Sequence, residues 1–248
     1  MEMVAHQRRT TWAGLLALVV LVMATGCLIM GQTGEVRTES VTAELGGAEE
    51  VDVHLRMGAG GLTLGGGADT LAAADFVYNV PDWRPTMDYV VAGDKGELWI
   101  EQPEVKTFGL ESYRYEWDIR LAGDVPMTLD VALGAGESDI DVSSLDVSEL
   151  DVKTGLGGLT LDLTGDRERD VDVTIKGGVG EATVLLPAEV GVRATVTGSL
   201  GEVAVVGLRR DGEAYVNEAH GDAANGSAAM ITLNVEGGVG EVTLKVAE

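Results

Sequence analysis

Apolar and polar side chains alternate with a period of two over much of residues 129–248. The clearest stretch, residues 150–163, carries apolar side chains on both sides of Gly157: Leu150, Val152, Leu156, Leu159, Leu161 and Leu163. A period of two is typical of β-strands that bury one face. A glycine between the two stretches supplies a positive φ and lets neighbouring backbones approach. The stretch therefore predicts two half-buried strands joined at a glycine corner.

The same frame recurs six times along the chain. The predicted corner glycines are Gly60, Gly136, Gly157, Gly180, Gly201 and Gly240. The four from Gly136 to Gly201 are 21, 23 and 21 residues apart, and 39 residues separate the last two. A repeat of that length holds about three short strands and suits one coil of a β-solenoid, whose coils pair and bury a shared core. The spacing predicts an all-β solenoid, with one degenerate coil or loop before Gly240; a flat meander or a sandwich is the alternative.

Residues 68–128 break this pattern. They contain nine of the eleven aromatic residues and four of the five prolines. Because prolines interrupt the hydrogen-bond ladder of a sheet, a regular coil is not expected here. Repeat arrays need an atypical end, and we expect an N-terminal β cap of antiparallel strands. The aromatic residues are expected to fill the core of this cap, with a ligand-binding platform as the alternative.

The N-terminus has the pattern of an export signal. Arg8 and Arg9 precede an uncharged apolar stretch, and small residues lead to Cys27, the chain's one cysteine. This order is typical of a secretory signal peptide. Residues 24–27 resemble a bacterial lipobox, which predicts cleavage after residue 26, lipidation of Cys27 and attachment to the membrane. A retained anchor helix extending to residue 30 is the alternative. Both predict that the rest of the chain lies on the extracytoplasmic face of the bacterial cell membrane.

The charge of the chain excludes one class of partner. The 248 residues include 17 basic and 41 acidic side chains, which give a formal net charge of −24. Such a chain repels phosphate backbones, so nucleic-acid binding is not expected. Aspartates recur at outward positions of the predicted strands: Asp130, Asp139, Asp141, Asp151, Asp162, Asp170 and Asp172. We interpret them as a solvated face that Lys153 and Lys176 partly neutralise; weak divalent-cation sites are the alternative.

No catalytic, metal or cofactor site is predicted. The Gly-Gly-Val-Gly of residues 177–180 and 237–240 is similar to calcium-binding β-roll motifs, but alanine and valine replace the calcium-binding aspartate. The histidines stand in the signal, a strand and a polar loop, and nothing in the sequence brings together His6, His54 and His220. A carbohydrate-cleaving solenoid needs paired carboxylates across a groove, and no pair stands out. We therefore expect no enzyme and no cofactor.

Several motifs carry a family resemblance over about residues 45–248. They are Gly60-Gly-Leu62-Thr-Leu64, Ala74-Asp75-Phe76-x-Tyr78-Asn79-x-Pro81-x-Trp83-x-Pro85, Gly96-x-Leu98-x-Ile100-x-Gln102 and Leu133-Gly134-Ala135-Gly136-Glu137-Ser138-x-Ile140-x-Val142. The chain resembles the toast-rack domain of bacterial envelope proteins and the neighbouring LiaF-like domain of cell-wall stress proteins. The resemblance implies a right-handed β-solenoid without known catalytic residues. LiaF-like proteins inhibit an envelope-stress sensor kinase through the membrane and usually carry several membrane helices, and the resemblance does not extend to such helices.

The sequence divides into four predicted parts. Residues 1–26 form a lipoprotein signal peptide, residues 27–44 a linker, residues 45–128 a toast-rack-like β domain and residues 129–248 the glycine-cornered repeats. These features predict a non-catalytic, lipid-anchored envelope protein that acts as an interaction or stress-sensing module with an unidentified envelope protein as partner. An adhesin or surface scaffold that binds glycans or itself is the first alternative. A carbohydrate-active β-helix enzyme is the second.

Overall fold

The structure is a computed structural model that describes residues 33–104, 112–198, 201–226 and 228–247. The predicted all-β class is confirmed, since these residues form one mixed sheet of sixteen strands and one short α-helix. The predicted signal peptide (1–26), Cys27 and the alternative anchor to residue 30 lie outside the described residues. In the described part of the chain, no helix combines the length and the apolar character needed to cross a membrane.

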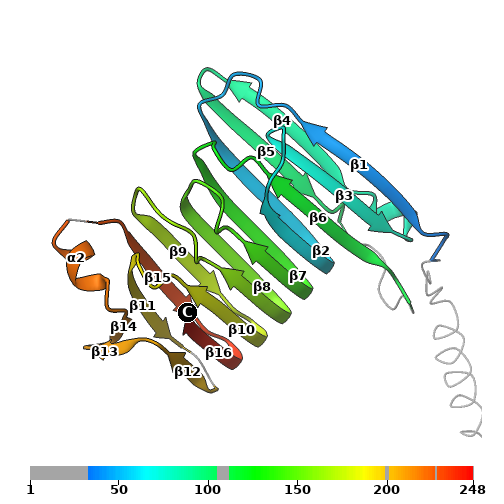
Figure 1. Cartoon of the computed structure of the whole chain (residues 1–248). Helices are drawn as coiled ribbons and strands as arrows, with labels where there is room; N and C mark the ends of the chain where they lie inside the picture. The colour runs from blue at the N-terminus through cyan, green and yellow to red at the C-terminus, as the bar shows by residue number, and fades with distance from the viewer. Residues whose placement is uncertain (1–32, 105–111, 199–200, 227, 248) are drawn as a thin grey trace, which may run out of the picture.

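Six strands form the first part of the sheet. They are β1 (Arg37–Ala43), β2 (Glu50–Gly66), β3 (Ala72–Tyr78), β4 (Thr86–Ala92), β5 (Lys95–Glu101) and β6 (Tyr115–Leu121). β3 is antiparallel to both β1 and β6, and β4 is antiparallel to β5. One turn of 3-10 helix, Pro81–Trp83, links β3 to β4, where the prolines prevent strand pairing. These antiparallel strands flank one end of the parallel stack, as Figure 1 shows.

Ten strands and a helix follow. They are β7 (Met127–Asp141), β8 (Val147–Asp162), β9 (Val171–Lys176), β10 (Val179–Leu186), β11 (Gly191–Thr197), β12 (Val203–Val206), β13 (Arg209–Asp211), β14 (Ala214–Val216), α2 (His220–Ala224), β15 (Met230–Glu236) and β16 (Val239–Val246). β2, β7 and β8 each run through a corner glycine, which divides the strand into a first and a second arm. Neighbouring long strands are parallel over both arms. Beyond β8 the arms are separate strands, and one first arm with its second arm is called a rung.

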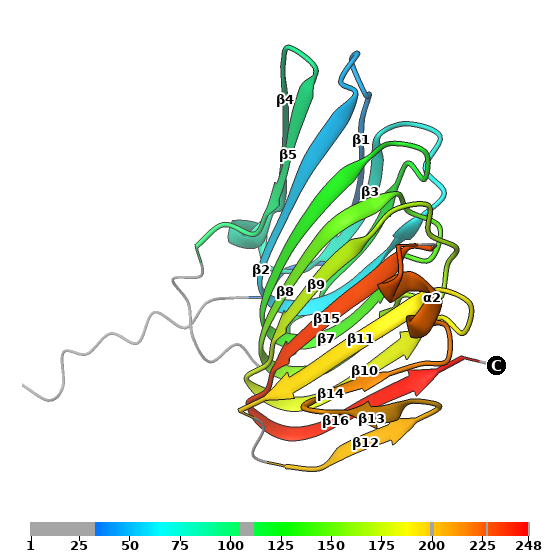
Figure 2. The same ribbon diagram turned by 90° about the vertical axis from the view of Figure 1, so that its left-hand side faces the viewer.

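The two arms enclose one core between them (Figure 2). On β2, for example, Val53 and Leu55 of the first arm and Leu62 and Leu64 of the second arm are buried. Five aromatic residues of the antiparallel flank are also buried, which confirms their expected packing role: Phe76, Tyr78, Trp83, Tyr115 and Trp117. Because β2 pairs with β7 along both arms, the sheet and its core continue through the expected domain boundary at residue 128.

The predicted corner glycines stack in one column. A Cβ built on Gly180 would overlap the carbonyl oxygen of Gly157, and the same overlap recurs at the other steps of the column. In spatial order the column consists of Gly60, Gly136, Gly157, Gly180, Gly240 and Gly201. The φ of Gly157 is +128° and that of Gly180 is +152°, in the region that favours glycine. Any side chain in this column would force adjacent rungs apart.

The order of the rungs in space differs from their order in the chain. β15 pairs with β9 on one side and with β11 on the other. Likewise, β16 lies between β10 and β12. The rung β15–β16 is therefore inserted between two rungs that precede it in the chain. The residues between Gly201 and Gly240 supply β12, the β13–β14 hairpin, α2 and β15, and not a single degenerate coil or loop.

Two further expectations need correction. A repeat does not contain three short strands: β7 has 15 residues and β8 has 16, and only a turn joins them. Val142 and Leu145 of that turn are buried, so two apolar side chains close the third side without a strand. In addition, the apolar residue before the corner glycine is exposed at Leu156, Val179 and Val239, because the bend leaves it on the outside of the corner. What the pairing establishes is a mixed sheet folded at its glycines.

Candidate functional site

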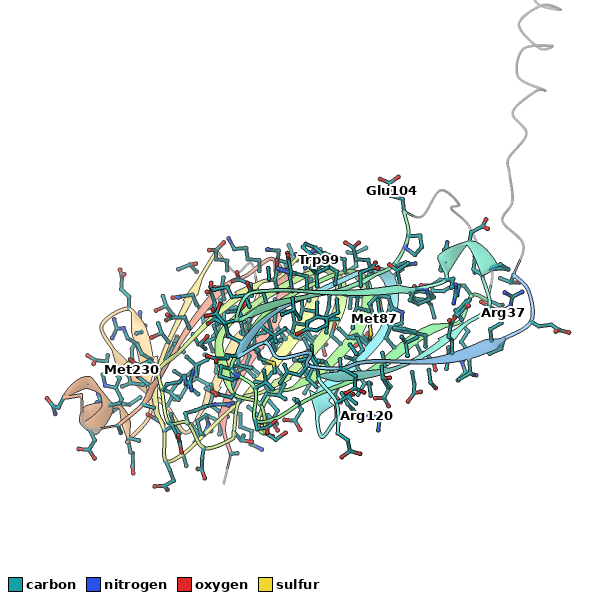
Figure 3. The ribbon with its side chains drawn as sticks, turned by 90° about the horizontal axis from the view of Figure 1, so that it is seen from above. Arg37, Met87, Trp99, Glu104, Arg120 and Met230 are labelled. Carbon is teal, nitrogen blue, oxygen red and sulfur yellow. The ribbon has the colours of Figure 1, made fainter. Side chains whose placement is uncertain are left out.

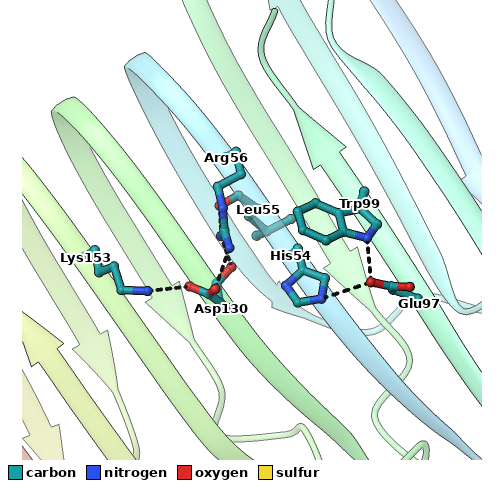
Figure 4. A network of polar contacts seen from close by, with 7 residues as sticks. All are labelled: His54, Leu55, Arg56, Glu97, Trp99, Asp130 and Lys153. Atoms are coloured by element: carbon teal, nitrogen blue, oxygen red, sulfur yellow. Dashed lines mark hydrogen bonds and ion pairs between the residues drawn. The ribbon is translucent and has the colours of Figure 1, made fainter.

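A group of polar and aromatic side chains lies on the outer face of the first arms (Figure 4). It spans four adjacent strands, and its residues are Glu97 and Trp99 of β5, His54 and Arg56 of β2, Asp130 of β7 and Lys153 of β8. The residues that alternate with them, such as Leu55 and Leu98, are buried in the core. The period of two therefore directs this group, called the outer-face cluster below, towards solvent.

Two rings form the aromatic half of the cluster. His54 and Trp99 face each other on paired strands, with ring centroids 4.0 Å apart and planes 22° from parallel. The Arg56 guanidinium carbon lies 5.6 Å from the Trp99 ring centroid, within the range of a cation–π contact. Trp99 donates a hydrogen bond of 3.0 Å from Nε1 to Oε1 of Glu97, and His54 Nε2 lies 3.8 Å from the same oxygen. The indole is thus held on several sides in one orientation.

Asp130 organises the charged half of the cluster. Its carboxylate accepts a hydrogen bond from Arg56 and one of 3.3 Å from Lys153 Nζ. Arg56 also donates a 2.8 Å bond to the backbone carbonyl of Asp130. Burial alone would raise the pKa of Asp130, but the hydrogen bonds and charges of Arg56 and Lys153 outweigh burial and lower the pKa below its ordinary value. The carboxylate is therefore ionised at neutral pH and fixes both cations.

A shallow groove of about 410 Å³ adjoins the cluster on the side of the corners. Its lining includes Arg56, Gly58, Gln102, Gly134, Lys153 and Gly155. Gln102 Oε1 accepts hydrogen bonds from the backbone N–H groups of Gly58 and Ala59, at 2.7 and 3.1 Å. Within the described residues, two polar atoms of this region are buried without a hydrogen-bond partner, namely Gln102 Nε2 and His54 Nδ1. The groove thus combines a glycine floor, an amide and two cations next to an indole.

This arrangement is suited to binding. An indole offers an apolar face, while Arg56 and Lys153 offer hydrogen-bond donors to a partner or ligand. The described residues contain no group of three or more His, Cys, Asp or Glu side chains that could hold a metal ion. Among the residues that the structure describes, Glu97 and Trp99 are the side-chain partners of His54, and no hydroxyl or thiol is hydrogen-bonded to it.

The outward aspartates named from the sequence do not form one site. Asp130 lies in the outer-face cluster, and Lys153 is its partner, as the sequence suggested. Lys176 instead pairs with Glu236 at 3.3 Å. Asp170 accepts a backbone hydrogen bond of 2.9 Å from Met230, and His220 begins α2, far along the chain from the cluster. The sequence flagged the aromatic-rich segment but could not reveal that Trp99 stacks on His54, which comes from a different strand.

The comparisons with known proteins agree with this fold. Residues 32–185 match the family model of the N-terminal toast-rack domain, and residues 130–244 match the C-terminal domain of LiaF, described as a cell wall-active antibiotics response domain. The first match covers more than half of the 248 residues, so the chain belongs to the toast-rack family. The predicted toast-rack and LiaF-like resemblance is thereby confirmed. These are not families of known enzymes.

Solved structures give a second line of comparison. A putative cell adhesion protein from Clostridium sporogenes is 34% identical, with a TM-score of 0.81, and the alignment covers 86% of this chain and 100% of that one. A putative adhesin from Bacteroides fragilis is 12% identical, with a TM-score of 0.36 and coverage of 87% and 99%. The comparison with curated proteins gave no match.

Proposed function

We propose that the chain is a non-catalytic, lipid-anchored protein of the bacterial cell envelope that acts as an interaction or stress-sensing module. In this proposal, Cys27 carries the lipid, and the folded sheet stands on the extracytoplasmic face of the membrane. We interpret the sheet as a short right-handed β-solenoid whose rungs give a stiff support. Membership of the toast-rack family and the LiaF-like match support a role at the envelope.

The outer-face cluster is the observation that carries the proposal. Its six side chains sit on four paired strands, so their spacing is fixed by the sheet and not by loops. Arg56 is held by Asp130 and by Trp99, which limits the side-chain freedom that binding would otherwise have to remove. Arginine and tryptophan are the residue types that most often dominate protein interfaces. A preordered Arg–Trp pair beside an open groove therefore suits recognition of a protein partner.

Co-purification with matched variants tests this proposal. The full chain, its Arg56→Ala/Trp99→Ala variant and its Arg120→Ala variant would be isolated from detergent-solubilised envelope. Arg120 is the control because it also pairs with a carboxylate, Asp75, at 3.0 Å but lies on the opposite face from Trp99 (Figure 3). We expect the envelope partner to be recovered with the wild-type and Arg120→Ala chains and lost with the double variant. Equal recovery with all three chains would exclude the cluster as the binding surface.

The lipid anchor has its own test. Metabolic labelling with a palmitate analogue is expected to mark the wild-type chain, and Cys27→Ser is expected to abolish both the label and cleavage after residue 26. A wild-type chain that keeps its full length in the membrane fraction and takes up no label would favour the alternative, an uncleaved anchor.

Glycan binding by an adhesin is the second candidate. The indole of Trp99 beside a groove with donor groups favours it, because sugar rings stack on aromatic faces. The 34% identical structure of the putative cell adhesion protein points in the same direction. Titration with cell-wall polysaccharide separates the two candidates: binding that disappears in Trp99→Ala supports an adhesin, and its absence in the wild-type chain argues against one.

A further inference from the structure

Three aliphatic side chains form an exposed row along the outside of the corners. Leu156, Val179 and Val239 each precede a corner glycine, and Val179 pairs in register with both of the others. Their exposed fractions are 58%, 52% and 51%. On the neighbouring rungs, Ala135 and Ala59 occupy the same position. With strands about 4.8 Å apart, the five residues extend over about 19 Å. Scattered exposed apolar side chains are common, but Leu156, Val179 and Val239 adjoin one another in register and form a continuous apolar strip.

Charges of opposite sign lie on the two sides of this row. On the second-arm side, Glu181 and Glu241 directly follow the corner glycines and pair in register, and both are exposed. On the first-arm side, Lys153 and Lys176 pair in register four residues before the corners and are also exposed. The same column contains Arg56 at one end and Glu236 at the other, and Glu236 forms a 3.3 Å ion pair with Lys176. The row therefore separates an acidic edge from an edge on which three cations outnumber one carboxylate, called the cationic edge below.

Glycines make the surface between the aliphatic row and the lysines almost free of side chains. Gly155, Gly178 and Gly238 stand two residues before the corner glycines, and each is packed against a backbone carbonyl of the adjacent rung. The aliphatic row therefore stands beside this strip of glycines, called the floor, which leaves room for the aliphatic side chains of a second row. We call the row, its two charged edges and this floor the corner ridge.

We infer that the corner ridge is a contact surface for a second copy of this chain. A two-fold axis parallel to the stack of rungs places the cationic edge of one copy over the acidic edge of the other. Lys176 and Glu181 belong to the same rung, so each Lys176, already paired with Glu236 of its own copy, then faces the Glu181 of the other copy as a second carboxylate. The aliphatic rows meet at the axis, as expected for a self-complementary interface. A two-fold axis perpendicular to the stack would oppose like charges, which excludes the antiparallel arrangement.

The orientation and the size of the contact both fit a membrane-anchored protein, and in this respect the inference rests on the proposed function. A two-fold axis along the stack leaves both copies pointing the same way, so that both anchors reach one membrane. The ridge measures about 19 Å along the stack, from the strand spacing, and about 17 Å across it, from the rise per residue between Lys176 and Glu181. This area is smaller than a standard interface and predicts weak association in solution. Anchoring in one membrane raises the effective concentration and favours such a contact.

Disulfide trapping in the native membrane tests this contact. A residue close to a two-fold axis meets its own copy, so the full-length Val179→Cys chain is expected to form a disulfide-linked dimer under mild oxidation. Val90→Cys is the matched control because Val90 is 64% exposed but lies on the edge strand β4, away from the ridge. The wild-type chain, whose one cysteine is Cys27, measures how much disulfide-linked dimer forms through Cys27 itself. No dimer from Val179→Cys, or equal dimer from both variants, would overturn the inference.

Reversal of charge gives a second readout. In the Val179→Cys background, Lys176→Glu is expected to reduce the trapped dimer at least tenfold, and further addition of Glu181→Lys is expected to restore it. Failure of the second change to restore the dimer would contradict the proposed pairing. Fractionation of the same samples scores the anchor independently. A chain that is anchored but not trapped overturns the ridge contact alone, and a chain that is trapped but not anchored overturns the anchor alone.

Discussion

Replacement of Gly180 by alanine should damage the fold far more than its small size suggests. The φ of Gly180 is +152°, and an L-residue in that region is strained by about 1–2 kcal/mol. The new Cβ would also overlap the carbonyl oxygen of Gly157, which is backbone and cannot rotate away. Separating β10 from β8 to relieve the overlap weakens two or three ladder hydrogen bonds of about 1 kcal/mol each. We expect the free energy of unfolding to fall by about 3–5 kcal/mol.

Two other glycines separate the strain from the overlap. Gly212 has a φ of +62°, and no atom lies within 4 Å of a Cβ built on it. Gly212→Ala should therefore lower the free energy of unfolding by about 1–2 kcal/mol, from backbone strain alone. Gly221 lies in α2 with open space and no restricted φ, so Gly221→Ala should be neutral or slightly stabilising. Urea unfolding followed by circular dichroism measures all three changes. If Gly180→Ala loses no more stability than Gly212→Ala, close stacking of the glycines does not hold the rungs together.

Three further changes test polar contacts. The side chain of Asn217 is 2% exposed and forms hydrogen bonds to the backbone of Val192, His220, Pro187 and Val190. Asn217→Ala should therefore lower the free energy of unfolding by about 3 kcal/mol in urea titration. A decrease below about 1 kcal/mol contradicts this. Arg167 donates hydrogen bonds of 2.7 and 2.9 Å to the carbonyls of Leu145 and Val142. In thermal unfolding, Arg167→Ala should therefore lower the free energy of unfolding by about 2 kcal/mol. The control Arg169→Ala removes a more exposed ion pair and should lower it by less than about 1 kcal/mol. The pKa of Asp130 is lowered in the fold, so its contribution of about 1 kcal/mol is present above its unfolded pKa of about 4 and is lost as the pH falls through the folded pKa. Stability curves of the wild type and Asp130→Asn should therefore converge in acid, and parallel curves would refute the assignment.

The local pattern of the fold could be predicted from the sequence. Alternation around Gly157 predicted bent strands with one buried face, because side chains in a strand alternate between its two sides. The prolines near Trp83 predicted a break in the pairing, and the structure has a 3-10 turn there. Both features depend on residues that are close together in the chain, and the periodicity of the sequence directly reflects such local structure.

The spatial order of the rungs could not be predicted in the same way. Residues 177–181 and 237–241 have the same sequence, so either segment could stack on the corner of β8 as far as pattern alone can tell. The structure places the first on β8 and the second between β10 and β12. The outer-face cluster escaped prediction for a related reason. Its members come from four strands, and their approach depends on the register between strands, which the sequence of one strand does not contain.

The inserted rung has a consequence for biogenesis. Synthesis delivers β11 to β14 before β15 and β16, yet β11 and β12 join the stack only through that later pair. Until those strands arrive, β11 can pair with β14, but β11 and β12 lack their parallel neighbours, and these strand edges remain open to proteases and to chaperones. A nascent chain stalled before residue 230 would thus lack an interior rung rather than an end, and its unpaired strand edges would mark it for quality control.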